Sequence, residues 1–172
     1  MADDAAYVAE ARRVLRRGGA FLCSTPNRVL TNPGTTKPFN PFHLREYTLP
    51  DPASRPRRLA VTSDDIIWYS DYSRGYLGRL DPATGKVSEY PSPSGPKSAP
   101  YGISAIHGVI WYSESEARPN TVVRFDPKTE KFQSWAIPGG GNIVRNTDVT
   151  QDGNFVLTNS LVNTVTLVTI PK

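Results

Sequence analysis

The sequence predicts an all-β fold made of repeated β-propeller blades, because three short elements recur along it in the same order. Trp68 and Trp111 lie 43 residues apart, and so do Tyr47 and Tyr90. A repeat of ~40–50 residues built from short strands and turns is typical of propeller blades. The recurring elements are residues 67–71, 110–114 and 155–159; residues 79–82 and 124–127; and residues 44–50, 87–93 and 132–138.

Each blade requires four short antiparallel strands joined by tight turns. In the clearest repeat the expected strands, from the innermost to the outermost, are residues 59–61, 66–70, 76–80 and 86–90. Gly85 supplies the positive φ that closes the outer hairpin, and Glu130 stands at the corresponding position of the next repeat. The chain thus encodes one isolated outer strand, two full blades and a partial third.

Complete propellers have about four to eight blades, so three blades predict an open arc. The end faces and strand edges of an arc are unpaired, which favours association between copies of the chain. The repeated aromatic residues have two interpretations: a surface that stacks on carbohydrate, or the packing between blades. We favour packing, because large rings at equivalent positions bury much area there. These residues are Trp68, Trp111, Trp135, Tyr69 and Tyr112.

The first 43 residues lie outside the repeat and form a separate unit, followed by the propeller blades at 44–172. Residues 3–16 place apolar side chains on one face of a predicted helix, which ends at Gly18 and Gly19. Residues 20–24 are expected to form a short buried strand, and residues 25–41 a loop. The apolar positions of the helix are Tyr7, Val8, Ala11, Val14 and Leu15.

The composition of the 172 residues is that of a soluble protein, with 38% hydrophobic and 21% charged residues. No apolar run approaches the ~20 residues that span a bilayer, so no membrane partner is expected. No targeting signal begins the sequence, which gives a cytoplasmic location by default. The net charge of +4 comes largely from arginines in residues 12–17 and 55–58. Nucleic-acid binding is one interpretation of these clusters. We favour solvated surfaces and expect no nucleic-acid partner, because no aromatic platform accompanies them.

Residues 9–19, 24–28 and 40–47 resemble a helix, a strand and the following loop late in the nucleotide-binding domain of class I methyltransferases that use S-adenosylmethionine. The family usually has proline where Arg17 stands. Its glycine-rich turn for the cofactor and its acidic residue for the ribose lie upstream of this stretch. This chain starts too late to contain them, so no S-adenosylmethionine binding is expected.

Residues 44–172 resemble the virginiamycin B lyase (streptogramin lyase) family of β-propellers. The resemblance lies in residues 57–61, 77–85, 98–103 and 139–145 and in the two tryptophan repeats. It implies carbon–oxygen elimination on a cyclic ester or depsipeptide, assisted by Mg²⁺. Residues 45–48 fit both families, which indicates a methyltransferase-like sequence joined to a propeller-like one. Natural recombination, deliberate fusion and an assembly error each account for such a junction.

By the same resemblance, catalytic blades carry Pro-His-Gly where an inner strand begins. Here Arg57 and Tyr101 stand at the histidine position, and Glu114 matches an acidic residue after the second strand. We therefore expect Tyr101 and Glu114 to be the catalytic candidates, while the sequence names no metal ligands. The expected substrate-binding residues are Arg57, Asp71, Arg145 and Asn159.

His107 is open to two interpretations, a catalyst or a residue of the hairpin turn after an inner strand, and we favour the turn. Without a histidine base, tyrosine would need its pKa moved far below the unperturbed ~10. The leading hypothesis is therefore a lyase-like propeller with little or no turnover of streptogramin. The alternatives are a non-catalytic propeller fragment that binds a small-molecule ligand or assembles with other chains, and a methyltransferase remnant.

Overall fold

The structure is a computed structural model that describes residues 10, 13–14 and 53–171. The chain divides into two compact units, Met1–Pro52 and Ala53–Lys172. Within the first unit Glu10, Arg13 and Val14 are helical and exposed, and the Arg13 guanidinium binds the Glu10 carboxylate at 2.6 Å. These residues agree with the predicted helix. The predicted strand at 20–24, the loop at 25–41 and the outer strand at 44–50 lie outside the described residues.

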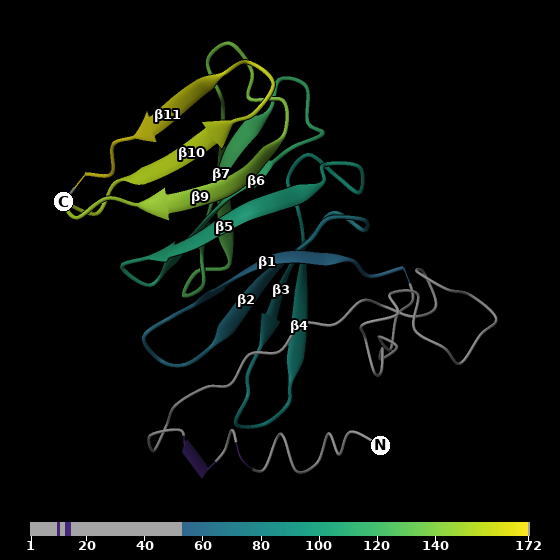
Figure 1. The fold of residues 1–172 in the computed structure, drawn as a ribbon. Helices are drawn as coiled ribbons and strands as arrows, with labels where there is room; N and C mark the ends of the chain where they lie inside the picture. The colour runs from purple at the N-terminus through teal and green to yellow at the C-terminus, as the bar shows by residue number, and fades with distance from the viewer. Residues whose placement is uncertain (1–9, 11–12, 15–52, 172) are drawn as a thin grey trace. The chain divides into compact units, whose positions relative to one another are not determined.

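Residues 53–171 form three antiparallel sheets and contain no helix, which confirms the all-β, partial-propeller prediction (Figure 1). Each sheet runs through its strands in chain order. The first contains β1 (Pro56–Val61), β2 (Ile67–Asp71), β3 (Tyr76–Leu80) and β4 (Val87–Pro91). The second contains β5 (Pro100–Ile106), β6 (Val109–Glu114), β7 (Thr121–Asp126) and β8 (Lys131–Ala136). The third contains β9 (Val144–Val149), β10 (Phe155–Asn159) and β11 (Thr164–Val168).

The turns carry the backbone conformations that the sequence predicted. Gly85 closes the outer hairpin of the first sheet with φ of 70°, and Glu130 adopts φ of 53° at the same point of the second. The strained Glu130 also accepts a hydrogen bond from the Tyr90 hydroxyl at 3.0 Å, which links the outer parts of the two sheets. His107 occupies the turn between β5 and β6 with φ of 51°, so its assignment to a hairpin turn is confirmed.

The core lies between successive sheets. Between the first and second sheets, Trp68 is 2% exposed and packs on Phe125 with ring centroids 5.5 Å apart. Between the second and third sheets, Trp111 packs on the ring of Phe155, with ring centroids 6.1 Å apart. The two tryptophans therefore hold equivalent positions in the two interfaces, as the repeat predicted. Trp135, at 46% exposed, is the one repeated tryptophan that remains partly at the surface.

In the part of the chain that the structure describes, no helix has the length and apolar character needed to cross a membrane.

Candidate functional site

The inner strands β1, β5 and β9 lie side by side (Figure 1), and each is irregular where it begins. On β1 the pairing with β2 moves from Pro56↔Asp71 to Leu59↔Tyr69, so β1 has one residue more than its partner. The same extra residue occurs on β5 and on β9. A β-bulge of this kind re-aims side chains and is common beside functional sites. The bulges contain Arg57 and Arg58 on β1, Tyr101 and Gly102 on β5, and Arg145 and Asn146 on β9.

Arginine and tyrosine side chains meet at these bulges. The guanidinium carbon of Arg57 lies 5.0 Å from the centroid of the Tyr72 ring and 5.7 Å from that of Tyr101. Arg58 approaches the Tyr101 ring at 5.4 Å, and the two tyrosines meet edge to face at 5.5 Å. Both distances for the Arg57 guanidinium are within the ~6 Å at which a cation is attracted to an aromatic face.

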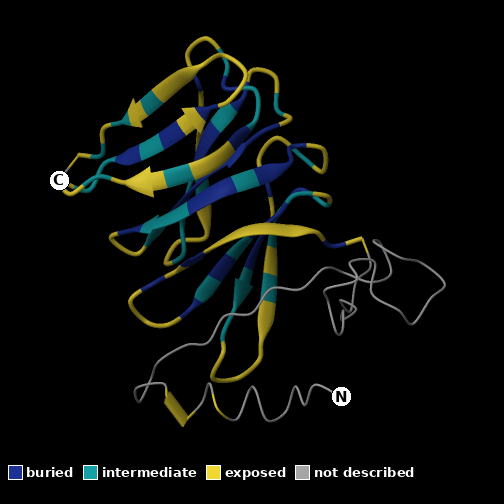
Figure 2. Cartoon of the chain, in the orientation of Figure 1, coloured by how far each residue is buried: buried dark blue, intermediate teal, exposed yellow. Residues whose placement is uncertain are grey.

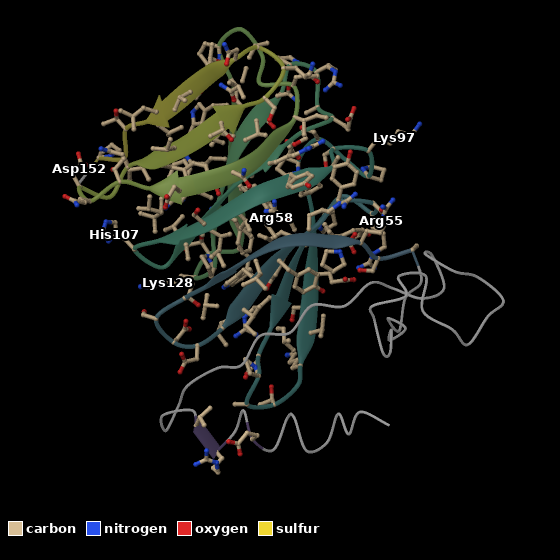
Figure 3. All side chains as sticks on the ribbon, in the orientation of Figure 1. Arg55, Arg58, Lys97, His107, Lys128 and Asp152 are labelled. Atoms are coloured by element: carbon tan, nitrogen blue, oxygen red, sulfur yellow. The ribbon has the colours of Figure 1, made fainter. Side chains whose placement is uncertain are left out.

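Arg58 connects the first inner strand to the third. Its guanidinium donates a hydrogen bond to Asn146 Oδ1 at 3.3 Å. Gly102 of β5 leaves room for β9, because a Cβ at this position would lie 2.5 Å from Cγ2 of Thr147. We call Arg57, Arg58, Tyr72, Tyr101 and Asn146 the inner-strand cluster. Figure 3 shows Arg58 beside β1 and Arg55 near the start of that strand, whereas His107 lies at the opposite end of the sheets.

Asp71 ends β2 with its side chain fully buried. Its carboxylate accepts hydrogen bonds from Ser54 Oγ at 2.6 Å and from the backbone N–H of Arg55 at 3.0 Å, and Arg74 Nε donates at 2.7 Å. Burial by itself raises the pKa of Asp71, but these hydrogen bonds outweigh it and hold the pKa below its ordinary value. Asp71 therefore holds three segments together. These are residues 54–55 before β1, the end of β2, and the turn after β2 that contains Arg74.

Glu114 ends β6 and is also fully buried. Its carboxylate accepts hydrogen bonds from Ser92 Oγ and Ser94 Oγ, both at 2.6 Å, and from the Ser94 N–H at 2.9 Å. The Thr121 hydroxyl donates another. Because Ser92 and Ser94 follow β4, this carboxylate joins the first sheet to the second.

Asn159 holds the equivalent place in the third sheet and is 2% exposed. Its amide nitrogen donates to the hydroxyls of Thr164 and Thr166, but its Oδ1 has no hydrogen-bond partner. The residues corresponding to Ser92 and Ser94 are Ile137 and Gly139, which offer no hydroxyl. The third sheet therefore lacks the serine hydroxyls that donate to the Glu114 carboxylate, and an uncharged amide, Asn159, stands in place of that carboxylate.

The structure thus separates the predicted site residues into two groups. Arg57, Tyr101 and Arg145 lie on the bulges, where Arg57 and Arg145 are exposed and Tyr101 is half-buried. Asp71, Glu114 and Asn159 are buried. Their contacts give them a structural role, and a catalytic or ligand-binding role for them stays a prediction.

Sequence reasoning missed Arg58, Tyr72 and Asn146. Arg58 and Asn146 follow Arg57 and Arg145 directly along the chain, but only a bulge brings both neighbours to the same site. Tyr72 follows Asp71, directly after β2, and its backbone N–H donates a hydrogen bond to the Arg55 carbonyl at 3.2 Å, just before β1. In the sequence, only its position directly after the end of the second strand indicated that Tyr72 could belong to the site.

The described residues do not fit a magnesium ion. No group of three or more His, Cys, Asp or Glu among them is close enough to hold a metal. The hydrogens of hydroxyl and N–H donors point at the carboxylate oxygens of Asp71 and Glu114, where a cation would need free lone pairs.

A hollow of about 590 Å³ lies between the second and third sheets, at the end away from the inner-strand cluster, and is lined mainly by apolar groups. Trp111 and Trp135 stack at 5.9 Å on its wall. The interface between the first and second sheets is filled at this end by the ring of Phe132, which packs on Phe125 at 4.6 Å. In the third sheet the smaller Val168 stands at the position of Phe125. No described strand pairs with the outer edge of β11, so no described residue takes the place of Phe132 there.

Three repeated antiparallel sheets with side-by-side inner strands define an arc of a β-propeller. Solved structures of similar fold include virginiamycin B lyase from Staphylococcus aureus, with 22% identity and a TM-score of 0.57, over 74% of this chain and 45% of that one. A catalytically inactive variant of that enzyme, solved with quinupristin, has 25% identity and a TM-score of 0.58 over the same shares. A streptogramin B lyase has 25% identity and a TM-score of 0.57, over 74% of this chain and 44% of that one.

A shorter likeness links the chain to curated methyltransferases. A probable S-adenosylmethionine-dependent methyltransferase of Mycolicibacterium smegmatis is 59% identical over 44 residues, which are 26% of this chain and 17% of that protein. One from Mycobacterium tuberculosis is 52% identical over 44 residues, or 16% of its length. No family model matches the chain. Both resemblances predicted from the sequence are confirmed. The chain spans less than half of the lyases and about a sixth of the methyltransferases.

Proposed function

We propose that this chain is a lyase-like propeller module that binds an anionic or carbonyl-bearing small ligand at the inner-strand cluster. The observation that carries the proposal is the convergence of Arg57 and Arg58 on the Tyr101 ring, at bulges of adjacent inner strands. The nearby carboxylates of Asp71 and Glu114 are buried and hydrogen-bonded within the protein. The exposed charge at the bulges is therefore that of the arginines.

The chemistry of the cluster favours a planar oxygen acceptor. A guanidinium offers several N–H donors in a fixed plane and binds carboxylates in bidentate fashion. The tyrosine rings restrain the guanidinium groups, so less rotational freedom is lost when a ligand binds. Arg145, exposed on the third inner strand, adds a further positive charge to the same row of bulges.

Carbon–oxygen elimination is the second candidate function, and the lyase fold supports it. Elimination requires a base near the proton next to a carbonyl. Among the described residues His107 is the one histidine, and it lies in the turn between β5 and β6, at the far end of the sheets (Figure 3). Binding without turnover is therefore the function that the geometry favours.

The proposal predicts that quinupristin, the ligand solved with the inactive S. aureus lyase, binds the full chain. Tyr101→Ala and Arg57→Ala should each weaken binding about tenfold, because each removes an interaction worth roughly 1.5 kcal/mol. Isothermal titration calorimetry measures the dissociation constants. Lys128→Ala is the matched control, because it removes one exposed positive charge from an outer hairpin at the opposite end of the sheets (Figure 3).

Equal weakening by Arg57→Ala and Lys128→Ala would mean that only net charge attracts the ligand. That result, or unchanged affinity in Tyr101→Ala, would refute the inner-strand cluster as the binding site.

A further inference from the structure

The two end faces of the described arc are the two halves of an interface that the chain already builds twice. In each interface the forward face of one sheet, which carries Trp68 or Trp111, covers the rear face of the next. The third sheet has a forward face and the first has a rear face, and no described sheet packs on either of them. We propose that these two faces join between two copies of the chain and close a ring of six blades.

On the forward face of the third sheet, Val165 stands where the other two sheets bury an apolar residue in the interface. Leu77 pairs with Ser70, Val122 with Ser113 and Val165 with Thr158, so these three apolar residues are equivalent. Leu77 and Val122 are 0% and 4% exposed, because the next sheet covers them. Val165 is 68% exposed. Figure 2 shows the same contrast between the buried β6 and the largely exposed β11.

The rear face of the first sheet likewise exposes an apolar residue, Leu59, at a position that is buried in the second sheet. Leu59 pairs with Tyr69 as Ile103 pairs with Tyr112, so Leu59 and Ile103 are equivalent. Ile103 is 6% exposed and belongs to the same core cluster as Leu77, whereas Leu59 is 45% exposed. The equivalents of Leu77 and Ile103 are therefore Val165 of one copy and Leu59 of the other.

The Thr158 hydroxyl stands where the two built interfaces each have a serine that bonds to the next sheet. Ser70 and Ser113 donate hydrogen bonds to the next inner strand, at Tyr101 O (2.7 Å) and Val144 O (3.1 Å). Thr158 holds the equivalent position in the third sheet, where its exposed hydroxyl bonds to Asn146 O of its own sheet at 3.2 Å. A second copy would supply an inner-strand backbone for Thr158, as β5 and β9 do for the two serines.

The geometry favours two copies over any other number. A contact between unlike faces closes into a ring only if the rotation returns to its start, and otherwise gives filaments. Propellers have about four to eight blades. Two copies supply six sheets, whereas three copies would supply nine. The chain covers 45% of the length of the S. aureus lyase, so two copies supply about as much propeller as one lyase chain.

Sedimentation equilibrium of the full chain tests the proposal. We expect a mass twice the 18.9 kDa of one chain. Leu59→Glu and Val165→Lys should each give monomers. In a ring of two identical variant chains, each of the two interfaces would bury one unpaired charge. An equimolar mixture of the two variants should restore dimers, because one interface is then wild type and the other pairs glutamate with lysine. Thr129→Lys, on an exposed hairpin of the second sheet, should remain dimeric.

Circular dichroism of each variant establishes that the sheets are intact, and both substituted positions are exposed. A monomeric wild-type chain at high micromolar concentration would overturn the proposal, and so would open polymers. Dissociation by only one of the two variants, or no recovery in the mixture, would show that like faces meet or that another surface is used. Either result would also overturn it.

Discussion

Trp68→Ala is expected to lower the free energy of unfolding by about 3–5 kcal/mol, the range for truncating a buried aromatic side chain. Trp68 is 2% exposed and contacts the rings of Phe125 and Tyr90, so the substitution leaves a cavity between the first two sheets. Urea unfolding followed by far-UV circular dichroism measures the loss.

Trp135→Ala is the matched control for this experiment. It removes the same side chain from an outer strand, where the ring is 46% exposed and stacks on Trp111. We expect a loss of about 1 kcal/mol from that stacking. Equal losses at the two positions would mean that Trp68 does not lie in the packing between the sheets.

Glu114→Gln is expected to lower the free energy of unfolding by about 3 kcal/mol, although glutamine has nearly the same size. The carboxylate accepts bonds from two serine hydroxyls, a backbone N–H and the Thr121 hydroxyl. An amide NH₂ turned toward these donors leaves at least one buried donor without an acceptor, and hydrogen bonds to a charged group contribute ~1.5–3 kcal/mol.

The control is Glu116→Gln, two residues further along. Glu116 is exposed and pairs with Arg118 at the surface, so its substitution should cost less than about 0.5 kcal/mol. Urea unfolding of the two variants side by side gives the comparison. A Glu114→Gln protein as stable as Glu116→Gln would show that the carboxylate does not join the first two sheets, and would favour its catalytic role.

The repeat was sufficient to predict the sheets, because strand patterns, turn residues and core aromatics are encoded locally. Trp68 and Trp111 could be placed in equivalent interfaces from their spacing alone, and His107 could be assigned to a turn from the glycine that follows it. Trp135 departs from the pattern because it stands on an outer strand, beside a hollow that no described residue fills.

The site was only partly predictable. The family resemblance identified Arg57 and Tyr101 at the start of inner strands, and Arg145 was expected to bind substrate; the structure puts all three on bulges. The sequence did not reveal the bulges themselves, because a one-residue register shift depends on the neighbouring strand. The inclusion of Arg58 and Asn146 follows from those shifts.

The burial of the strand-end polar residues also depends on packing between sheets. Asp71, Glu114 and Asn159 resemble solvent-facing groups in the sequence, because each ends a strand and precedes a polar loop. Their partners lie in segments that folding brings back to them, such as Ser54 for Asp71 and Ser92 for Glu114. Only the loss of serines at Ile137 and Gly139 gave a sequence signal, since it accompanies the change from Glu114 to Asn159.

Binding without elimination is tested most directly by incubating the full chain with quinupristin and magnesium and following the ligand by liquid chromatography and mass spectrometry. Elimination opens the ring without adding water, so its product has an unchanged mass and a different retention time. We predict that quinupristin is recovered unchanged, at concentrations where calorimetry shows the chain to be saturated, because the inner-strand cluster holds no histidine base. Accumulation of the ring-opened isomer, abolished by Tyr101→Phe, would contradict this account and make the chain a lyase in its own right.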